Sequence, residues 1–167
     1  MLGNISLKSE NLSGSNDKSY SEAENSYIKA LNLYPQFCFP CNGLGNIYRE
    51  CGIYDKAIHY YKKAATIDET FMYPWNYMGD CFRYLEKYDI AFQCFKRAIE
   101  LSNNDNVIMP LYGLGRIYYE LGNRKNNNEK YYYKALEYFK SVEEKTPTYP
   151  PQIRFALKDM AQVYQKL

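Results

Sequence analysis

Two cysteines in the segment Cys38-Phe39-Pro40-Cys41 have a spacing that could support chemistry. A CxxC pair at the start of a helix can have a lowered thiol pKa and can take part in disulfide exchange. The βαβ surroundings of a thioredoxin-like site are absent, and a zinc site would need a second pair of ligands. The remaining candidate ligands occur singly: Cys51, His59, Cys81 and Cys94. We therefore expect the pair to pack in an apolar core, with a redox or metal role as an alternative.

Other catalytic signatures are missing from the sequence. It contains no glycine-rich phosphate loop, no paired-carboxylate signature and no nucleophile elbow, so we expect no enzyme activity and no cofactor. A net charge of +2 does not favour nucleic acid or an anionic membrane as a partner. No stretch is apolar enough to span a membrane or to act as a secretory signal. Five cysteines without a regular framework favour a reducing compartment, so we expect a cytoplasmic location.

An internal repeat predicts the elements that position these residues. Thirty-four residues separate Gly45 from Gly79, and thirty-six separate Gly79 from Gly115. Each glycine follows an apolar residue and precedes Tyr or Phe by three positions. A second set recurs downstream as Ala57, Tyr61 and Ala64, then Ala91, Phe95 and Ala98, then Ala135, Phe139 and Val142. A period near 34 with this composition indicates a repeat of two helices joined by a turn.

The pattern resembles the tetratricopeptide repeat family over roughly residues 20–167. The resemblance implies an all-α, right-handed solenoid of antiparallel helix pairs, in which each repeat has a first helix, A, and a second helix, B. It implies about three full repeats, an N-terminal half repeat and a C-terminal capping helix. The expected division is a flexible arm at 1–17, a half repeat at 18–35, repeats at 38–71, 72–105 and 108–147 with an insert at 123–130, and a cap at 150–167.

Local signals refine this division. Gly52 suits the turn between two helices, whereas Glu86 occupies the same place in the next repeat and must make the turn at some local cost. Gly122 is expected to stop the third helix A, and the repeated glycines are expected to let helix backbones approach closely. The last helix is expected over about 152–166. Its pattern is similar to that of a helix A, and Asp159 is expected on its solvent-exposed face. It should pack through Ile153, Leu157, Met160, Ala161, Tyr164 and Leu167.

The resemblance also implies a concave groove lined by the A helices. The groove positions hold Asn42, Asn46 and Arg49, then Tyr73, Asn76, Asp80 and Arg83, then Tyr112, Arg116 and Tyr119, with Phe39, Glu50, Tyr84, Met109 and Glu120 completing the set. Amides can hold a peptide backbone, and Arg can bind a carboxylate through two hydrogen bonds. We expect a non-catalytic adaptor or scaffold that binds a peptide or protein segment here.

One specialised groove of the family binds chaperone tails that end in Glu-Glu-Val-Asp. The five positions needed for that clamp hold Asn42, Asn46, Tyr77, Met109 and Gly113 here, and only Asn46 matches. We therefore expect no measurable binding of such a tail.

The half repeat provides an alternative function. Its expected helix has no recognisable helix A to cover its apolar flank at Ala23, Tyr27, Ala30 and Leu31. Exposed apolar patches often mark contacts. The alternative is a structural subunit that docks through this N-terminal edge into a larger assembly, such as a homodimer.

Overall fold

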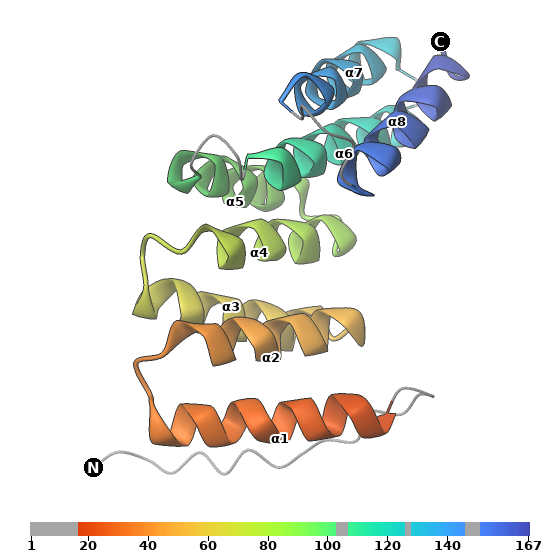
Figure 1. The fold of residues 1–167 in the computed structure, drawn as a ribbon. Coiled ribbons are helices and arrows are strands. Elements are labelled where there is room, and N and C mark those ends of the chain that lie inside the picture. Colours follow the sequence, from red (N-terminus) through yellow and green to blue (C-terminus); the bar gives the residue numbers. More distant parts are fainter. Residues whose placement is uncertain (1–16, 103–106, 126–127, 146–150) are drawn as a thin grey trace.

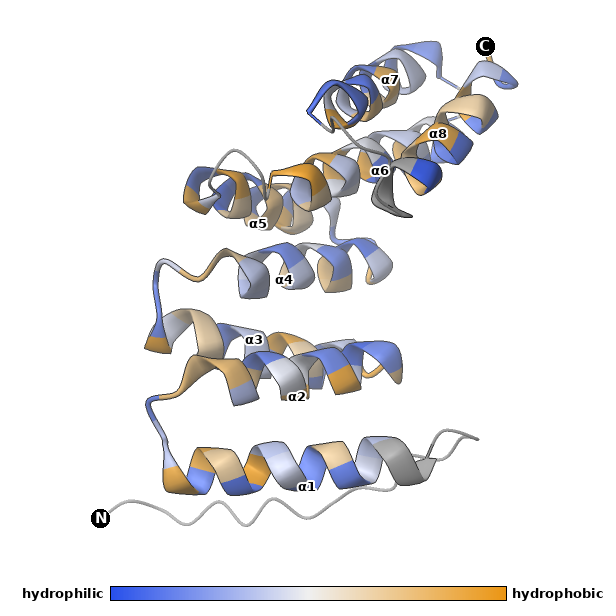
Figure 2. Ribbon diagram, in the orientation of Figure 1, coloured by the Kyte–Doolittle hydropathy of each residue, from blue (hydrophilic) through white to orange (hydrophobic). Residues whose placement is uncertain are grey.

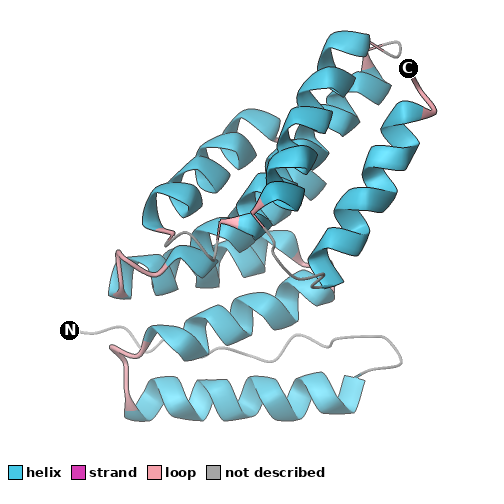
Figure 3. Ribbon diagram, turned by 45° about the horizontal axis from the view of Figure 1, so that its top comes forward, coloured by secondary structure: helices cyan, strands magenta, loops and turns pink. Residues whose placement is uncertain are grey.

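The computed structural model describes residues 17–102, 107–125, 128–145 and 151–167. Within these ranges the chain forms helices and no strand (Figure 3). The helices are α1 Asp17–Leu33, α2 Cys38–Glu50, α3 Tyr54–Ile67, α4 Met72–Tyr84, α5 Tyr88–Leu101, α6 Ile108–Arg124, α7 Glu129–Glu144 and α8 Pro151–Tyr164. The expected flexible arm lies outside the described residues, apart from Asp17, where α1 begins.

The helices stack in chain order from α1 to α8 and form an all-α solenoid (Figure 1). The closest packing is within the pairs α2 with α3, α4 with α5, and α6 with α7. At one end, α1 packs mainly on α2, and at the other end α8 packs on α7 and α6. Figure 2 shows hydrophobic segments where stacked helices face one another. This is the architecture that the repeat predicted.

Helix starts follow from local sequence. Pro40 and Pro74 lie in the first turns of α2 and α4, where a backbone N–H has no intrahelical partner and its loss costs nothing. Asp55 and Asp89 lie in the first turns of α3 and α5, where a negative charge suits the helix dipole. At the start of α7, the Asn128 side chain accepts a hydrogen bond from the backbone N–H of Lys130 at 3.1 Å.

The turns between helices A and B of the first two repeats each contain one left-handed residue. Gly52 has φ of 74°, and Glu86, which takes its place in the next repeat, has φ of 60°. A side chain in this conformation costs about 1 kcal/mol or more. The same backbone bonds close both turns, from Ile53 to Tyr48 and from Lys87 to Phe82, each at 2.8 Å. The sequence-based expectation of a strained turn at Glu86 is confirmed.

The repeated glycines receive aromatic rings. A Cβ on Gly45 would lie 2.4 Å from the ring of Tyr61, and a Cβ on Gly79 would lie 2.7 Å from the ring of Phe95. The expectation of close backbone approach was therefore wrong in its detail, because the glycines make room for a ring of the facing B helix. Phe95 also faces Gly113 of α6, where an added Cβ would lie 2.3 Å away. Its ring thus joins two repeats.

The third pair differs from expectation at its turn. Gly122 does not end α6, which continues to Arg124, and α7 already begins at Glu129. The physical reason is a contact with Tyr132, whose ring would lie 2.6 Å from a Cβ on Gly122. The Tyr132 hydroxyl also donates to Oδ1 of Asn123 at 2.8 Å. The expected insert at 123–130 therefore contributes to both helix ends, and residues 126–127 lie outside the described residues.

The last helix, α8, is rotated relative to the expected face. Ala156, Met160 and Val163 are buried against α7, because these side chains complete the apolar cluster around Phe139. Of the predicted stripe, Met160 is buried, Ile153 lies outside the described side chains, and the remaining members are exposed: Leu157, Ala161, Tyr164 and Leu167. Asp159, predicted to face solvent, is only 4% exposed. Both expectations for this helix were therefore wrong.

Candidate functional site

A cavity of about 270 Å³ opens between the A helices of the second and third repeats and α8. It is lined by Asn76, Asp80, Arg83 and Tyr84 of α4, Met109, Tyr112 and Arg116 of α6, and Phe155 of α8. The structure therefore brings together seven of the fifteen groove residues that the sequence predicted. Phe155 was missed, because the sequence placed no residue of the cap at the groove.

Unpartnered polar atoms accumulate along the predicted groove. Asn76 is 1% exposed, and its Oδ1 has no hydrogen-bond partner in the protein. The other buried side-chain atoms of the described residues that lack a partner are Oδ1 of Asn42, Nε1 of Trp75, and Nε of Arg49, Arg83 and Arg116. Five of these six atoms belong to predicted groove residues. Because buried polar groups are normally hydrogen-bonded, such atoms indicate where a ligand could bind.

Arg83 lies at the centre of an ion-pair network. Its Nη1 lies 2.6 Å from Oε1 of Glu120, and its Nη2 lies 3.6 Å from Oδ1 of Asp80. Burial raises the pKa of Asp80, although the charge of Arg83 opposes this effect. Arg83 is itself only 7% exposed, so its guanidinium is held by the protein's own carboxylates.

Arg116 is held in the same way. Its Nη1 lies 3.1 Å from Oδ2 of Asp159, and its Nη2 lies 3.4 Å from Oε1 of Glu120. The hydroxyl of Tyr112 also donates to Oδ2 of Asp159 at 2.8 Å. Two groove arginines are therefore already paired with carboxylates of the chain. This corrects the expectation that they would be available to bind a ligand carboxylate.

The predicted groove residues of the first repeat lie outside the cavity. Asn46 accepts a hydrogen bond from the Tyr61 hydroxyl at 2.8 Å, and Asn42 is half-buried. Arg49 pairs with Glu50 at 2.6 Å and lies over the ring of Tyr77.

Two predicted tyrosines also lie outside the cavity. Tyr73 stacks with Tyr77 of its own helix, whereas Tyr119 faces Tyr132 of α7. Neither side chain therefore lines the cavity, which is formed by other residues of α4 and α6 and by Phe155 of α8.

The predicted N-terminal edge is partly exposed. Ala23 and Ala30 are half-buried, and Tyr27 is 36% exposed although its ring lies against Gly43. Leu31 instead packs against the apolar clusters of the first repeat. Leu31 is half-buried, as Ala23 and Ala30 are.

The cysteine pair is buried. Cys38 is 6% exposed and Cys41 is fully buried, and both pack with Ala64. Burial raises the pKa of both thiols, whereas an exchange thiol needs a lowered pKa. Among the described residues, no group of three or more His, Cys, Asp or Glu side chains could hold a metal ion. These observations support packing as the role of the pair.

Thiol labelling provides a test. Burial also raises the pKa of Cys81 to about 12 and that of Cys94 to about 11. Because thiolate forms only as the pH approaches the pKa, these cysteines and the CxxC pair should stay protonated at pH 8. We expect a pulse of iodoacetamide at pH 8 to label half-exposed Cys51 at least about tenfold faster than the other four. Mass spectrometry would measure this, and rapid labelling of Cys38 or Cys41 would instead support the redox role.

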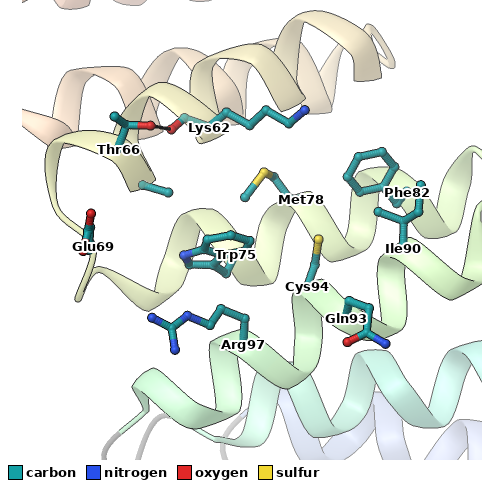
Figure 4. A pocket seen from close by; sticks show the side chains of 11 residues that line it. Lys62, Thr66, Glu69, Trp75, Met78, Phe82, Ile90, Gln93, Cys94 and Arg97 are labelled. Carbon is teal, nitrogen blue, oxygen red and sulfur yellow. Dashed lines mark hydrogen bonds between the residues drawn. The ribbon is translucent and has the colours of Figure 1, made fainter.

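A second cavity, of about 980 Å³, is lined by side chains of α3, α4 and α5 (Figure 4). Its floor is formed by Trp75, Met78 and Phe82 of α4, and Lys62 and Arg97 lie at its sides. The backbones of α3 and α5, the B helices of neighbouring repeats, do not approach each other closely, which leaves room for this cavity. No sequence pattern indicates it, since Trp75 occupies a position that is apolar in every repeat.

Stacked pairs of helices with a 34-residue period, and with glycines that receive rings, define an α-helical repeat protein. Two tetratricopeptide repeat family models match the chain, at residues 40–71 and 75–105. The chain is a tetratricopeptide-repeat protein. Proteins of this family are generally non-catalytic, and the chain is a protein-interaction scaffold in this general sense.

Similar solved structures include two crystal structures of MamA. One is 22% identical, with a TM-score of 0.57, and the match covers 88% of each chain. The other is 21% identical, with a TM-score of 0.63, and the match covers 89% of this chain and 80% of the other. At these identities the likeness shows the fold. No curated protein matches the sequence. None of the described helices has the length and apolar character needed to cross a membrane.

Proposed function

We propose that the groove along α2, α4 and α6 binds an extended segment of a partner protein. The observation that carries this proposal is the buried, unpartnered Oδ1 of Asn76. Asn42 occupies the same position one repeat earlier, and its Oδ1 is also unpartnered. An amide oxygen accepts a backbone N–H, so two such groups in successive repeats suit a peptide backbone that runs across the A helices.

The electrostatics of the groove favour a segment without a carboxylate at the cavity. Arg83 and Arg116 are already neutralised by Glu120 and Asp159. The lining also contains the Asp80 carboxylate, which would repel a second carboxylate, and the aromatic or apolar side chains of Tyr84, Met109 and Phe155. We therefore propose that one neutral, apolar or aromatic side chain of the partner enters this cavity, while the amides bind the backbone. That Glu-Glu-Val-Asp tails show no measurable binding remains our prediction.

A peptide display library offers a direct test. Peptides of random sequence would be selected on the wild-type protein, and their affinities would be measured by fluorescence polarisation. We expect Asn76→Leu to weaken binding by about tenfold or more, because the backbone hydrogen bond is lost. The fold should be unaffected, since leucine has a similar shape and Oδ1 bonds nothing in the free protein.

The matched control is Arg97→Ala, at the side of the larger cavity. It should bind the selected peptides like the wild type. If Arg97→Ala lost binding while Asn76→Leu retained it, the groove would not be the binding site. Equal melting temperatures of the two variants would show that both are folded.

We extend this proposal to the class of protein and to its location in the cell. We propose a non-catalytic adaptor without a cofactor, and the raised thiol pKa values of Cys38 and Cys41 support this over a redox role. We also propose a cytoplasmic location, supported by cysteines that form no disulfide among the described residues.

A further inference from the structure

The two ends of the solenoid carry complementary halves of a repeat. In each complete repeat, three side chains of helix B are buried, and helix A of the same repeat contributes to their burial, as Gly45, Gly79 and Gly115 do for the three rings. These sets are Ala57, Tyr61 and Ala64, then Ala91, Phe95 and Ala98, then Ala135, Phe139 and Val142, and all nine residues are 0% exposed. The equivalent positions on α1 are Ala23, Tyr27 and Ala30, which are partly exposed. Among the described helices, α1 is therefore a helix B without its helix A.

At the other end of the stack, α8 takes the place of a helix A. It packs on α7 and α6 in the way that α4 packs on α3 and α2. In the complete repeats, three positions of helix A face helix B of the same repeat. In the first repeat, Gly45 faces Tyr61, and Cys41 packs with Ala64. The rings of Tyr48 and Tyr60 stack with their centroids 5.5 Å apart. The equivalent residues of α8 are Leu157, Ala161 and Tyr164, and all three are exposed. Helix α8 is therefore a helix A without its helix B.

We propose that α8 of one copy packs on α1 of a second copy and thereby forms a complete A–B pair between chains. Tyr27 would lie against Ala161 of the other copy as Tyr61 lies against Gly45. Alanine carries one methyl group more than glycine. The α1 and α8 helices of two copies must therefore lie slightly farther apart than helices A and B of one repeat. No turn links the two helices, so nothing prevents this adjustment.

The contact joins different surfaces of the two copies. Such a head-to-tail contact leaves one unpaired α1 and one unpaired α8, and each further copy can add to them. The association also costs translational and rotational freedom that a pair within one chain does not lose. The assembly should therefore be open-ended and strongly dependent on protein concentration. The surface is separate from Asn42 and Asn76, so the proposal is independent of the proposed groove function.

Sedimentation velocity over about 5–500 µM protein tests the proposal. We expect the mean mass of the wild-type chain to rise beyond that of a dimer. Tyr27→Glu and Tyr164→Glu each remove one of the two faces, so each variant alone should remain monomeric. An equimolar mixture of the two variants should form dimers and nothing larger, because one intact α1 face meets one intact α8 face.

Other outcomes overturn the proposal. A wild-type chain that stays monomeric throughout would show that these faces do not bind each other. Dimers of Tyr164→Glu alone would indicate a symmetric contact between two α1 helices, and dimers of Tyr27→Glu alone would indicate a contact between two α8 helices. Tyr133→Glu is the matched control, because Tyr133 is exposed on α7, away from both faces. This variant should assemble like the wild type. If Tyr27→Glu lost helix content, Ala23→Glu would replace it.

Discussion

Replacing Phe95 by alanine should lower the free energy of unfolding by about 3–5 kcal/mol. The ring is fully buried and lies between Gly79 of α4 and Gly113 of α6. Neither glycine has a side chain that could move into the space, and two helix backbones would have to shift to close it. Most of the space left by the Phe95 ring should therefore stay empty. The loss of stability should then lie near the upper end of the range for phenylalanine-to-alanine substitutions. Urea denaturation followed by circular dichroism would measure the change.

Phe37→Ala is a suitable control for this experiment. Phe37 precedes α2 and is 47% exposed, so its truncation should change the free energy of unfolding by less than about 1 kcal/mol. A similar small effect at Phe95 would show that its ring does not join the second and third repeats.

Asp159→Ala should weaken the packing of α8 on the solenoid. The substitution leaves Arg116 and the Tyr112 hydroxyl without their shared carboxylate. Removing one partner of a buried pair costs about 3–5 kcal/mol, but Arg116 is partly solvated, so we expect about 2–3 kcal/mol. Because α8 is a terminal helix, the loss should appear as local opening. Hydrogen exchange of α8 amides should accelerate strongly, while exchange in α2 to α5 stays unchanged.

Lys158→Ala provides the comparison for this second prediction. Lys158 is the exposed neighbour of Asp159 on the same helix, so its truncation should leave hydrogen exchange nearly unchanged. Equal exchange rates of α8 in the two variants would contradict a stabilising role for the Asp159 contacts.

The repeat period was sufficient to predict the helix pairs. Apolar and small residues at fixed positions leave little choice about which helix faces are buried, so Tyr61, Phe95 and Phe139 occupy equivalent places. The position of Asn76 in the groove also followed, because five equivalent positions on an A helix share one face.

Features that depend on contacts between distant helices could not be predicted in this way. The carboxylate of Asp159 pairs with Arg116, forty-three residues earlier, and Glu120 pairs with Arg83, thirty-seven residues earlier. A single sequence does not indicate such partners, so both arginines looked available for a ligand. The face of α8 was ambiguous for a related reason. Its apolar residues surround the helix, and only the packing against α7 selects Met160 over Leu157.

The ring of Phe95 has a consequence for how the chain unfolds. A side chain that belongs to two adjoining repeats cannot lose its packing in one without weakening the other. In a linear array, this nearest-neighbour coupling decides whether units melt separately or together. The second and third repeats should therefore melt as one cooperative block, and fraying should begin at the termini, where α1 and α8 each have fewer neighbours.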